Sequence, residues 1–249
     1  MEKKANDALL ARAGKLYFTT GSVGLEEFDC TVHPDWHALF VSANKGATVA
    51  DDDARIVLLK TVKITLHGRL KGGSSLDWIR AADPDKPLDQ DSSTLLDSMH
   101  GATEQTLQGF MQFWTPFVDG SAMPANSDGL EMTKTDMGYT LHAVTKDTTV
   151  TEQMDKQLLL THFDVILSQT TVNFEPAYKP TDQGLLVNGF VAHIVPAGAA
   201  PGQAQEMHVA IEYQDVDGAP IPAKLDMSVV GTGIFNFNFE GCQVSKSAK

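Results

Sequence analysis

The sequence predicts an α+β fold in which a long antiparallel meander of strands packs against helices. Apolar residues recur every three or four positions in much of the first half of the chain, which is typical of amphipathic helices. From Gly138 onward they alternate with polar residues, which is typical of half-buried strands. Because helices come first and short connections join the later strands, neighbouring strands are expected to pair antiparallel.

Length and composition favour one globular domain over residues 1–249. Single β-rich domains routinely reach about 200–250 residues, and the chain has 249, of which 42% are hydrophobic. Its 19 basic and 32 acidic residues give a formal charge of −13. Such a surface repels nucleic-acid phosphates and anionic membranes. No apolar run approaches the ~20 residues of a spanning helix. We therefore expect neither a nucleic-acid partner nor an integral membrane protein.

The first part of the chain predicts short elements. Residues 5–18 carry an apolar stripe that predicts a helix, and residues 25–32 alternate as a strand does. Pro34 ends that strand, and residues 35–44 read as a short helix. Residues 55–69 fit either a strand or a helix followed by a strand. A further helix is predicted over residues 76–82.

The strongest helical pattern covers residues 95–117, after serine and aspartate N-cap candidates at residues 91–93. Pro116 is expected to end or bend its last turn. Its apolar stripe contains these residues: Leu95, Met99, Ala102, Thr106, Phe110, Phe113 and Phe117, widened by Leu107, Met111 and Trp114.

Strands are predicted over the remaining chain: residues 139–146, 149–154, 158–167, 171–178, 185–195, 207–215, 223–230 and 233–244. Asp217-Gly218 is a hairpin-turn signal between two of them. In the last strand Phe235, Phe237 and Phe239 are expected to face the core. Asn236 and Asn238 then face solvent.

The sequence contains no decisive catalytic signature, and we expect a binding protein without a metal or cofactor. Ser42-Ala-Asn-Lys45 matches a serine–lysine pattern whose companion motifs are absent, so chance explains it better. His33 and His37 are separated by Pro34, and no carboxylate accompanies them as a ligand. The acidic run 51–53 lacks the spacing of a calcium loop. Paired carboxylates of a hydrolase stay open, because their separation is spatial.

The 95–117 helix is richer in methionine and aromatic residues than an ordinary packing face requires. Such side chains suit loosely shaped acyl chains, although the same stripe is also what a packed core looks like. If the helix faces a cavity, six residues are expected to line the binding site: Met99, Ala102, Phe110, Phe113, Trp114 and Phe117.

Several segments resemble the outer-membrane lipoprotein-sorting and lipoprotein-carrier superfamily. They include Tyr139-Thr-Leu-His-Ala-Val, Val172-Asn-Phe-Glu-Pro and Ile234-Phe-Asn-Phe-Asn-Phe, and the most specific is the hairpin from Tyr213 to Pro222. The likeness covers roughly residues 25–35 and 139–244. It implies an incomplete, strongly curved antiparallel barrel with helices across its open side and lipid acyl chains held between them.

The resemblance also implies export to the periplasm or cell surface and a leader that this sequence lacks. The residues alone fit a cytosolic protein equally well. The leading hypothesis is a carrier whose partner is a lipid or lipoprotein acyl chain. The alternative is an exported structural or interaction domain filled by its own side chains. An unrecognised hydrolase is the third hypothesis, and the oligomeric state stays open.

Export has a consequence for Cys30 and Cys242, which fall on the first and last predicted strands. Exported proteins oxidise two such thiols more often than they keep them free. We therefore predict that these two cysteines lie close enough to form a disulfide bond.

Overall fold

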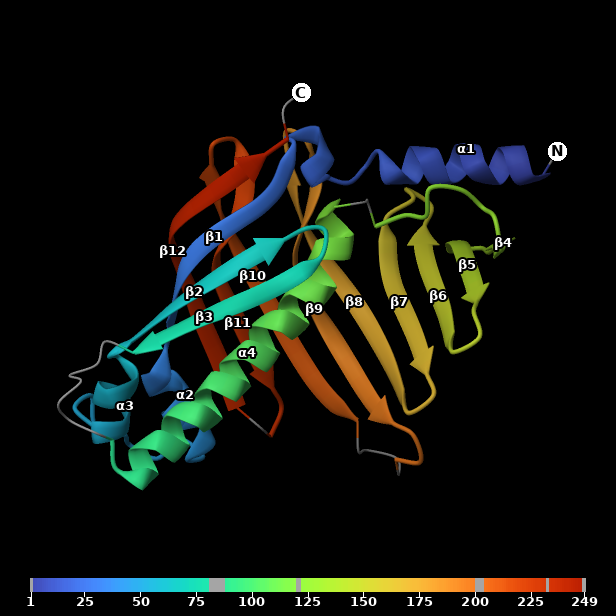
Figure 1. Ribbon diagram of the computed structural model, residues 1–249. Helices are drawn as coiled ribbons and strands as arrows, with labels where there is room; N and C mark the ends of the chain where they lie inside the picture. The colour runs from blue at the N-terminus through green and yellow to red at the C-terminus, as the bar shows by residue number, and fades with distance from the viewer. Residues whose placement is uncertain (1, 81–87, 120–121, 200–203, 232, 248–249) are drawn as a thin grey trace. The chain divides into compact units, whose positions relative to one another are not determined.

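The computed structural model describes residues 2–80, 88–119, 122–199, 204–231 and 233–247 (Figure 1). Within them, twelve strands form one antiparallel sheet in the order β3-β2-β1-β12-β11-β10-β9-β8-β7-β6-β5-β4. Strands β3 and β4 are its two edges, so the sheet does not close into a barrel. This architecture confirms the predicted α+β class and an antiparallel sheet that does not close.

The helices lie mainly in the first half of the chain. They are α1 (Glu2–Gly14), α2 (Trp36–Ala43), α3 (Ala54–Leu59) and α4 (Gln90–Asp119), with a short 3₁₀ turn at Thr20–Ser22. The strands before α4 are β1 (Leu25–Pro34), β2 (Val62–Arg69) and β3 (Gly73–Arg80). Nine strands follow it: β4 (Leu130–Lys134), β5 (Gly138–Val144), β6 (Thr148–Asp155), β7 (Leu160–Leu167), β8 (Thr170–Thr181), β9 (Gly184–Pro196), β10 (Gln205–Val216), β11 (Ala219–Val229) and β12 (Gly233–Lys246).

The chain divides into two compact units. Unit 1 comprises Met1–Thr19, Pro116–Ala210 and Met227–Gly231, and unit 2 comprises Thr20–Thr115, Ile211–Asp226 and Thr232–Lys249. Unit 1 therefore contains α1 and strands β4–β9. Unit 2 contains α2, α3, most of α4 and strands β1–β3 and β12. Strands β10 and β11 each contribute to both units.

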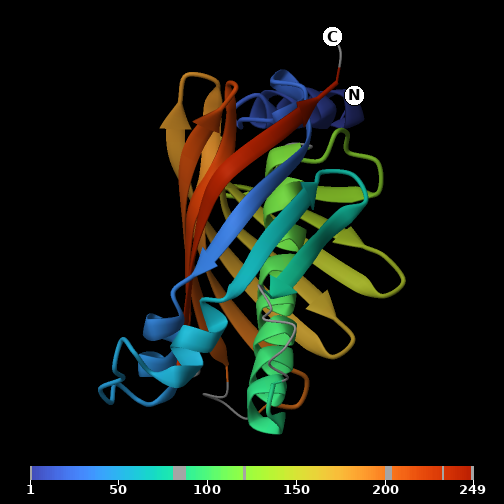
Figure 2. The same cartoon turned by 60° about the vertical axis from the view of Figure 1, so that its left-hand side comes forward.

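In unit 2 the first and last strands of the chain lie side by side (Figures 1 and 2). β1 pairs with β12 on one edge and with β2 on the other. The structure joins Cys30 of β1 to Cys242 of β12 by a disulfide bond, the pairing expected from the sequence. Gly68 of β2 lies opposite Phe28 of β1. A Cβ at position 68 would lie 2.3 Å from the ring of Phe28, so this position requires glycine.

The aromatic face of β12 follows the predicted alternation. Phe237 and Phe239 are buried, Phe235 is half-buried and Asn238 is exposed. Asn236 is half-buried, so its side chain is less solvated than predicted. The Asp217-Gly218 turn is also confirmed, since both residues have positive φ (51° and 78°), as a type I′ hairpin turn requires.

Two local predictions were wrong or incomplete. The helix predicted over residues 76–82 is strand β3 as far as the structure describes it, to Arg80. Leu76 and Trp78 alternate with exposed residues, and eight residue pairs with β2 override the weak helical pattern. Strand β4 was not predicted at all. For residues 55–69 the sequence allowed either a strand or a helix followed by a strand. The structure has the second arrangement, in which Asp53 caps α3 and β2 follows it.

Candidate functional site

The six residues expected to line a ligand cavity all lie on α4, and two of them, Phe110 and Trp114, belong to the stripe along which the helix is buried. In unit 2 this buried stripe contains the following residues: Leu96, Thr103, Leu107, Phe110, Met111 and Trp114. A second stripe beside it is half-buried: Leu95, Met99, Ala102, Thr106 and Phe113. Phe117, the sixth expected residue, belongs to unit 1 and packs against the hydrophobic cluster there. The structure thus separates the expected residues into three environments.

Trp114 is the last residue of the buried stripe and is inaccessible to solvent. Its indole ring meets Phe28 edge-on at 5.9 Å between centroids and stacks with Phe110 at 6.2 Å. The indole N–H donates a hydrogen bond to the Tyr213 hydroxyl at 2.8 Å. Burial raises the pKa of Tyr213, and that hydrogen bond acts in the opposite direction. This region is a packed interior with a satisfied polar pair.

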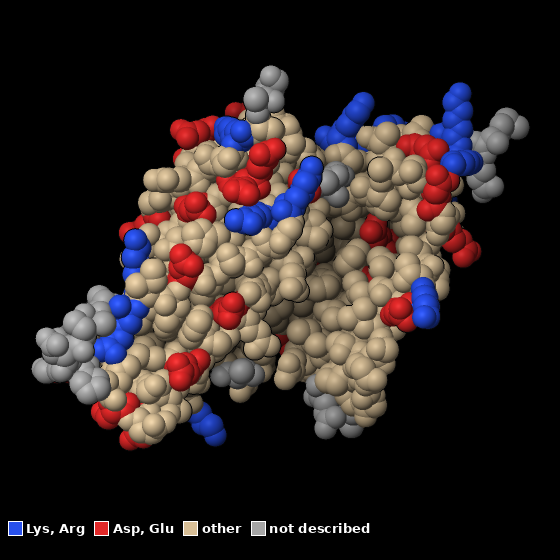
Figure 3. All heavy atoms as spheres, viewed as in Figure 1, with Lys and Arg blue, Asp and Glu red and all other residues tan. Residues whose placement is uncertain are grey.

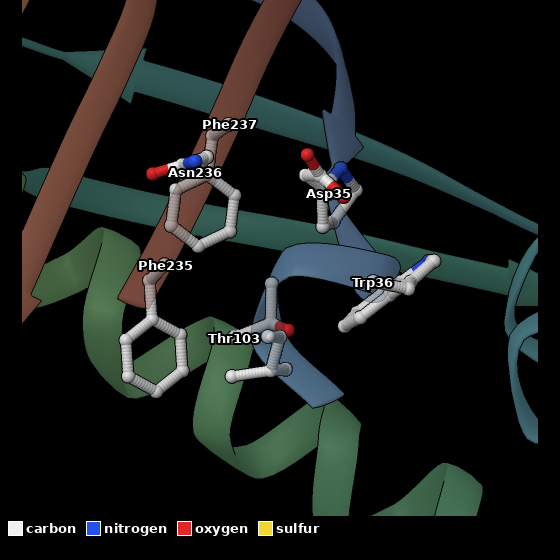
Figure 4. A pocket seen from close by; sticks show the side chains of 8 residues that line it. Asp35, Trp36, Thr103, Phe235, Asn236 and Phe237 are labelled. Carbon is white, nitrogen blue, oxygen red and sulfur yellow. The ribbon is translucent and has the colours of Figure 1, made fainter. Parts of the chain in front are cut away.

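A small apolar pocket lies where α2, α4 and β12 meet in unit 2. Trp36, Thr103, Phe235 and Phe237 are among its lining side chains (Figure 4). Its space is ~10 Å³, about enough for one water molecule. This pocket is therefore too small to hold an acyl chain.

Unit 1 presents a broader apolar surface on one face of its sheet. Directly paired residues of antiparallel strands point to the same side, so the register assigns each side chain to a face. One row runs Leu141–Glu152–Phe163–Phe174–Ala192–Met207 across β5 to β10. A second row runs Val150–Val165–Val172–Ile194. We call this side of the unit 1 sheet the apolar face.

Aromatic contacts confirm that assignment. The ring of Phe174 lies 6.0 Å from Phe163 and 5.6 Å from Phe190, measured between centroids. Most side chains in the middle of the apolar face are half-buried and not sealed from solvent: Ala143, Val150, Phe163, Val165, Val172, Phe174, Ile194 and Met207.

One end of the apolar face is covered within unit 1. There, Leu141, Met154 and Leu160 of the sheet form a hydrophobic cluster with Leu10 and Ala13 of α1. Tyr17, which follows α1, joins this cluster and accepts a hydrogen bond from the Leu160 N–H at 2.6 Å. The apolar face therefore changes from a packed end under α1 to a half-buried middle.

Glu152 lies between the packed end and the half-buried middle. Its register neighbours are Leu141 and Phe163, so its side chain emerges on the apolar face. Its Oε2 atom is buried and has no hydrogen-bond partner among the described residues. Burial raises the pKa of Glu152 to about 7. Burial is also the main cause that raises the pKa of both nearby phenols, Tyr17 and Tyr178, whose rings lie 5.3 Å apart.

Glu152 is not among the site residues predicted from the sequence, although the sequence contains a signal for it. Val150, Glu152 and Met154 share one phase of the predicted strand 149–154, so the alternation itself places a carboxyl group among apolar neighbours. The phase of a single strand could not show which side of the sheet is apolar. The pairing with β5 and β7 supplies that information.

The opposite side of the same sheet, the polar face, carries four histidines. His142 contacts the Thr151 hydroxyl at 3.1 Å, and His162 lies 3.0 Å from an Asp164 oxygen. Glu206 has one oxygen 2.6 Å from His208 and the other 3.7 Å from His193, and all three side chains are partly exposed to solvent. Among the described residues, no three or more His, Cys, Asp or Glu side chains are placed to hold a metal ion.

The remaining sequence candidates have structural roles. Ser42 of the serine–lysine match donates to the Leu39 carbonyl at 2.8 Å and accepts from the Ile234 N–H at 3.0 Å. Asp53 of the acidic run caps α3, and its hydrogen bonds with Arg55 lower its pKa to about 2. Acidic side chains are scattered over the face seen in Figure 3 and do not gather at one point.

Comparisons with known protein families, with curated proteins and with solved structures each found no match to this chain. Across the part of the chain that the structure describes, no helix has both the length and the apolar character to cross a membrane.

Proposed function

We propose that the protein is a non-catalytic binding or carrier protein that holds the apolar chain of a lipid or lipoprotein acyl group. The observation that carries this proposal is the half-buried middle of the apolar face of unit 1. Two adjoining rows of valine, phenylalanine and isoleucine leave apolar area there that a ligand can remove from water. Each buried methylene contributes ~0.8 kcal/mol, so an acyl chain of about ten methylenes needs no further chemistry to bind.

Within unit 2, considered by itself, the half-buried stripe of α4 is a second apolar surface of the kind that suits an acyl chain. Met99, Ala102 and Phe113 keep part of their surface accessible, whereas Phe110 and Trp114 are already packed by protein. We therefore assign ligand contact in unit 2 to the first three residues. The two packed residues stabilise the fold.

Export to the periplasm or cell surface is part of this proposal. The disulfide between Cys30 and Cys242 supports it, because such bonds persist in oxidising compartments and are rare in the cytosol. The likeness to the lipoprotein-carrier superfamily seen in the sequence supports the same location.

A matched pair of substitutions on β7 tests the proposal. Val165 lies on the apolar face, and its chain neighbour Ile166 lies on the opposite side, where 48% of its surface is exposed. A fluorescent fatty acid is titrated into wild type, Val165→Asp and Ile166→Asp. We expect Val165→Asp to lose binding by at least about tenfold, because a buried carboxylate opposes the acyl chain. Ile166→Asp should bind as wild type does.

Two results would contradict the proposal. One is equal binding by the two variants. The other is a wild-type protein that binds no fatty acid and carries no lipid in native mass spectrometry after purification. Ala102→Trp tests α4 separately: added bulk on the half-buried stripe should weaken binding if α4 contacts the ligand.

The packed interior of unit 2 favours a second candidate function. Phe110, Leu107 and Trp114 are fully buried, and Trp114 packs α4 against Phe28 of β1, as in an exported structural or interaction domain filled by its own side chains. Such a domain purifies without lipid and binds no fatty acid. The titration above therefore separates the two functions.

A further inference from the structure

Glu152 is placed where the polar end of an amphiphile bound to the apolar face would come to rest. It stands at the boundary between the end covered by α1 and the half-buried middle of the face. An acyl chain lying on Val150, Val165 and Val172 can extend away from this boundary. Its head then meets the one carboxyl group of the two rows.

The chemistry of Glu152 restricts what that head can be. The buried Oε2 atom of Glu152 accepts no hydrogen bond among the described residues, which costs free energy. A ligand head that donates a hydrogen bond to this oxygen would remove that cost. Among the described residues, the titratable groups whose pKa Glu152 raises are the phenols of Tyr17 and Tyr178, and neither supplies a positive charge. A second anion beside an ionised Glu152 would be repelled strongly in this apolar surrounding.

On the basis of the proposed function, we propose that Glu152 recognises the ligand head and selects amphiphiles whose head donates hydrogen bonds. An amine is the strongest member of this class because it donates up to three hydrogen bonds and carries a positive charge. A hydroxyl head is weaker, and a carboxylate head is weaker still.

The pH dependence of binding follows from the protonation of Glu152. Burial holds the pKa of Glu152 at about 7, so the carboxylate form prevails above pH 7 and the neutral acid below it. Affinity for an amine head falls as the pH drops through this range. Affinity for a carboxylate head rises, because protonated Glu152 becomes a donor.

The experiment compares three probes with the same chain: dodecylamine, dodecanol and dodecanoate. Each displaces a neutral fluorescent probe from wild type, Glu152→Gln and Glu175→Gln, well above and well below pH 7. Glu175 is exposed on the polar face of β8, so Glu175→Gln changes the net charge equally without touching the apolar face. Above pH 7 we expect wild type and Glu175→Gln to bind the amine at least about tenfold more tightly than dodecanoate. Glu152→Gln should lose that preference.

Glu152→Leu provides a second readout that does not depend on a ligand. Removing an unpaired buried carboxyl group should raise the melting temperature of the free protein. A large fall would show that Glu152 supports the fold, which overturns a role in head recognition.

The outcomes also distinguish this inference from the proposed function. If the three probes bind equally, or if Glu152→Gln keeps the amine preference, head selection is wrong while apolar binding stands. If neither the fluorescent probe nor any amphiphile binds wild type, the proposed function fails and this inference fails with it.

Discussion

Replacing Trp114 and its neighbour Phe113 by alanine should separate the packed stripe of α4 from the half-buried one. Trp114 has no exposed surface and contacts Phe28, Phe110 and Tyr213. Truncating a fully buried Trp costs ~3–5 kcal/mol. The truncation also removes the hydrogen bond from the indole N–H to the Tyr213 hydroxyl. Loss of that hydrogen bond lowers the free energy of unfolding by up to about 1–3 kcal/mol more. Because the two contributions overlap, we expect Trp114→Ala to lower the free energy of unfolding by about 4–6 kcal/mol.

Phe113 is half-buried on the adjacent stripe. Its truncation removes apolar contacts over part of the ring only, and we expect a loss of about 1–2 kcal/mol. Trp114→Phe provides a control between these limits, because it keeps a ring in the interior but removes the hydrogen-bond donor. Its expected cost is about 1–3 kcal/mol.

Urea unfolding followed by far-UV circular dichroism measures these differences, with the disulfide kept oxidised throughout. Circular dichroism is preferable to fluorescence because two of the variants lack one of the protein's three tryptophans. Equal losses for Trp114→Ala and Phe113→Ala would refute the assignment of the two stripes. A loss below about 2 kcal/mol for Trp114→Ala would show that it lines a cavity and is not packed.

Three further predictions concern unit 2. Phe237→Ala should cost ~3–5 kcal/mol in urea unfolding, because Phe237 is 2% exposed, whereas Asn238→Ala on the solvent side should cost little; equal costs would contradict the assigned faces. His67 hydrogen-bonds two aspartates, which raises its pKa above 6.5, so its stabilising contribution is complete at lower pH and is lost as the pH rises through the raised value. The difference in melting temperature between wild type and His67→Asn should therefore shrink from about pH 6 to about pH 8.5, and a constant difference would exclude this linkage. Reduction of the disulfide, whose cysteines are 212 residues apart, should destabilise the protein by up to about 5 kcal/mol; two reactive thiols in protein folded under oxidising conditions would disprove the bond.

The sheet was largely predictable because strand alternation is a local property. All eight strands expected after Gly138 are present, and the Asp217-Gly218 turn has the backbone that its residues favour. Strand β3 was mistaken for a helix because the segment expected to be helical, residues 76–82, is short, and pairing with β2 decides the conformation of its described part, residues 76–80. Strand β4 was missed because it has five residues and lies at an edge of the sheet.

The candidate site was less predictable because it depends on the register between neighbouring strands, which the alternation within one strand does not give. The apolar phase of β6 identifies Val150, Glu152 and Met154 as neighbours on one side. Only its pairing with β5 and β7 shows that this side is apolar across the sheet, so that Glu152 is a half-buried acid among apolar neighbours, with one buried oxygen that has no hydrogen-bond partner among the described residues.

The apolar surface of α4 shows the same limit in a different form. Its hydrophobic residues cover such a wide arc that several neighbouring stripes could face the sheet, and periodicity alone cannot choose among them. The structure buries the stripe that runs from Leu96 to Trp114 and leaves Met99, Ala102 and Phe113 half-buried beside it. A helix that only closed a hydrophobic core would need the first stripe and would tolerate polar residues along the second. That the second stripe is also apolar is therefore an argument for a ligand, and polar substitutions there should weaken binding far more than they weaken folding.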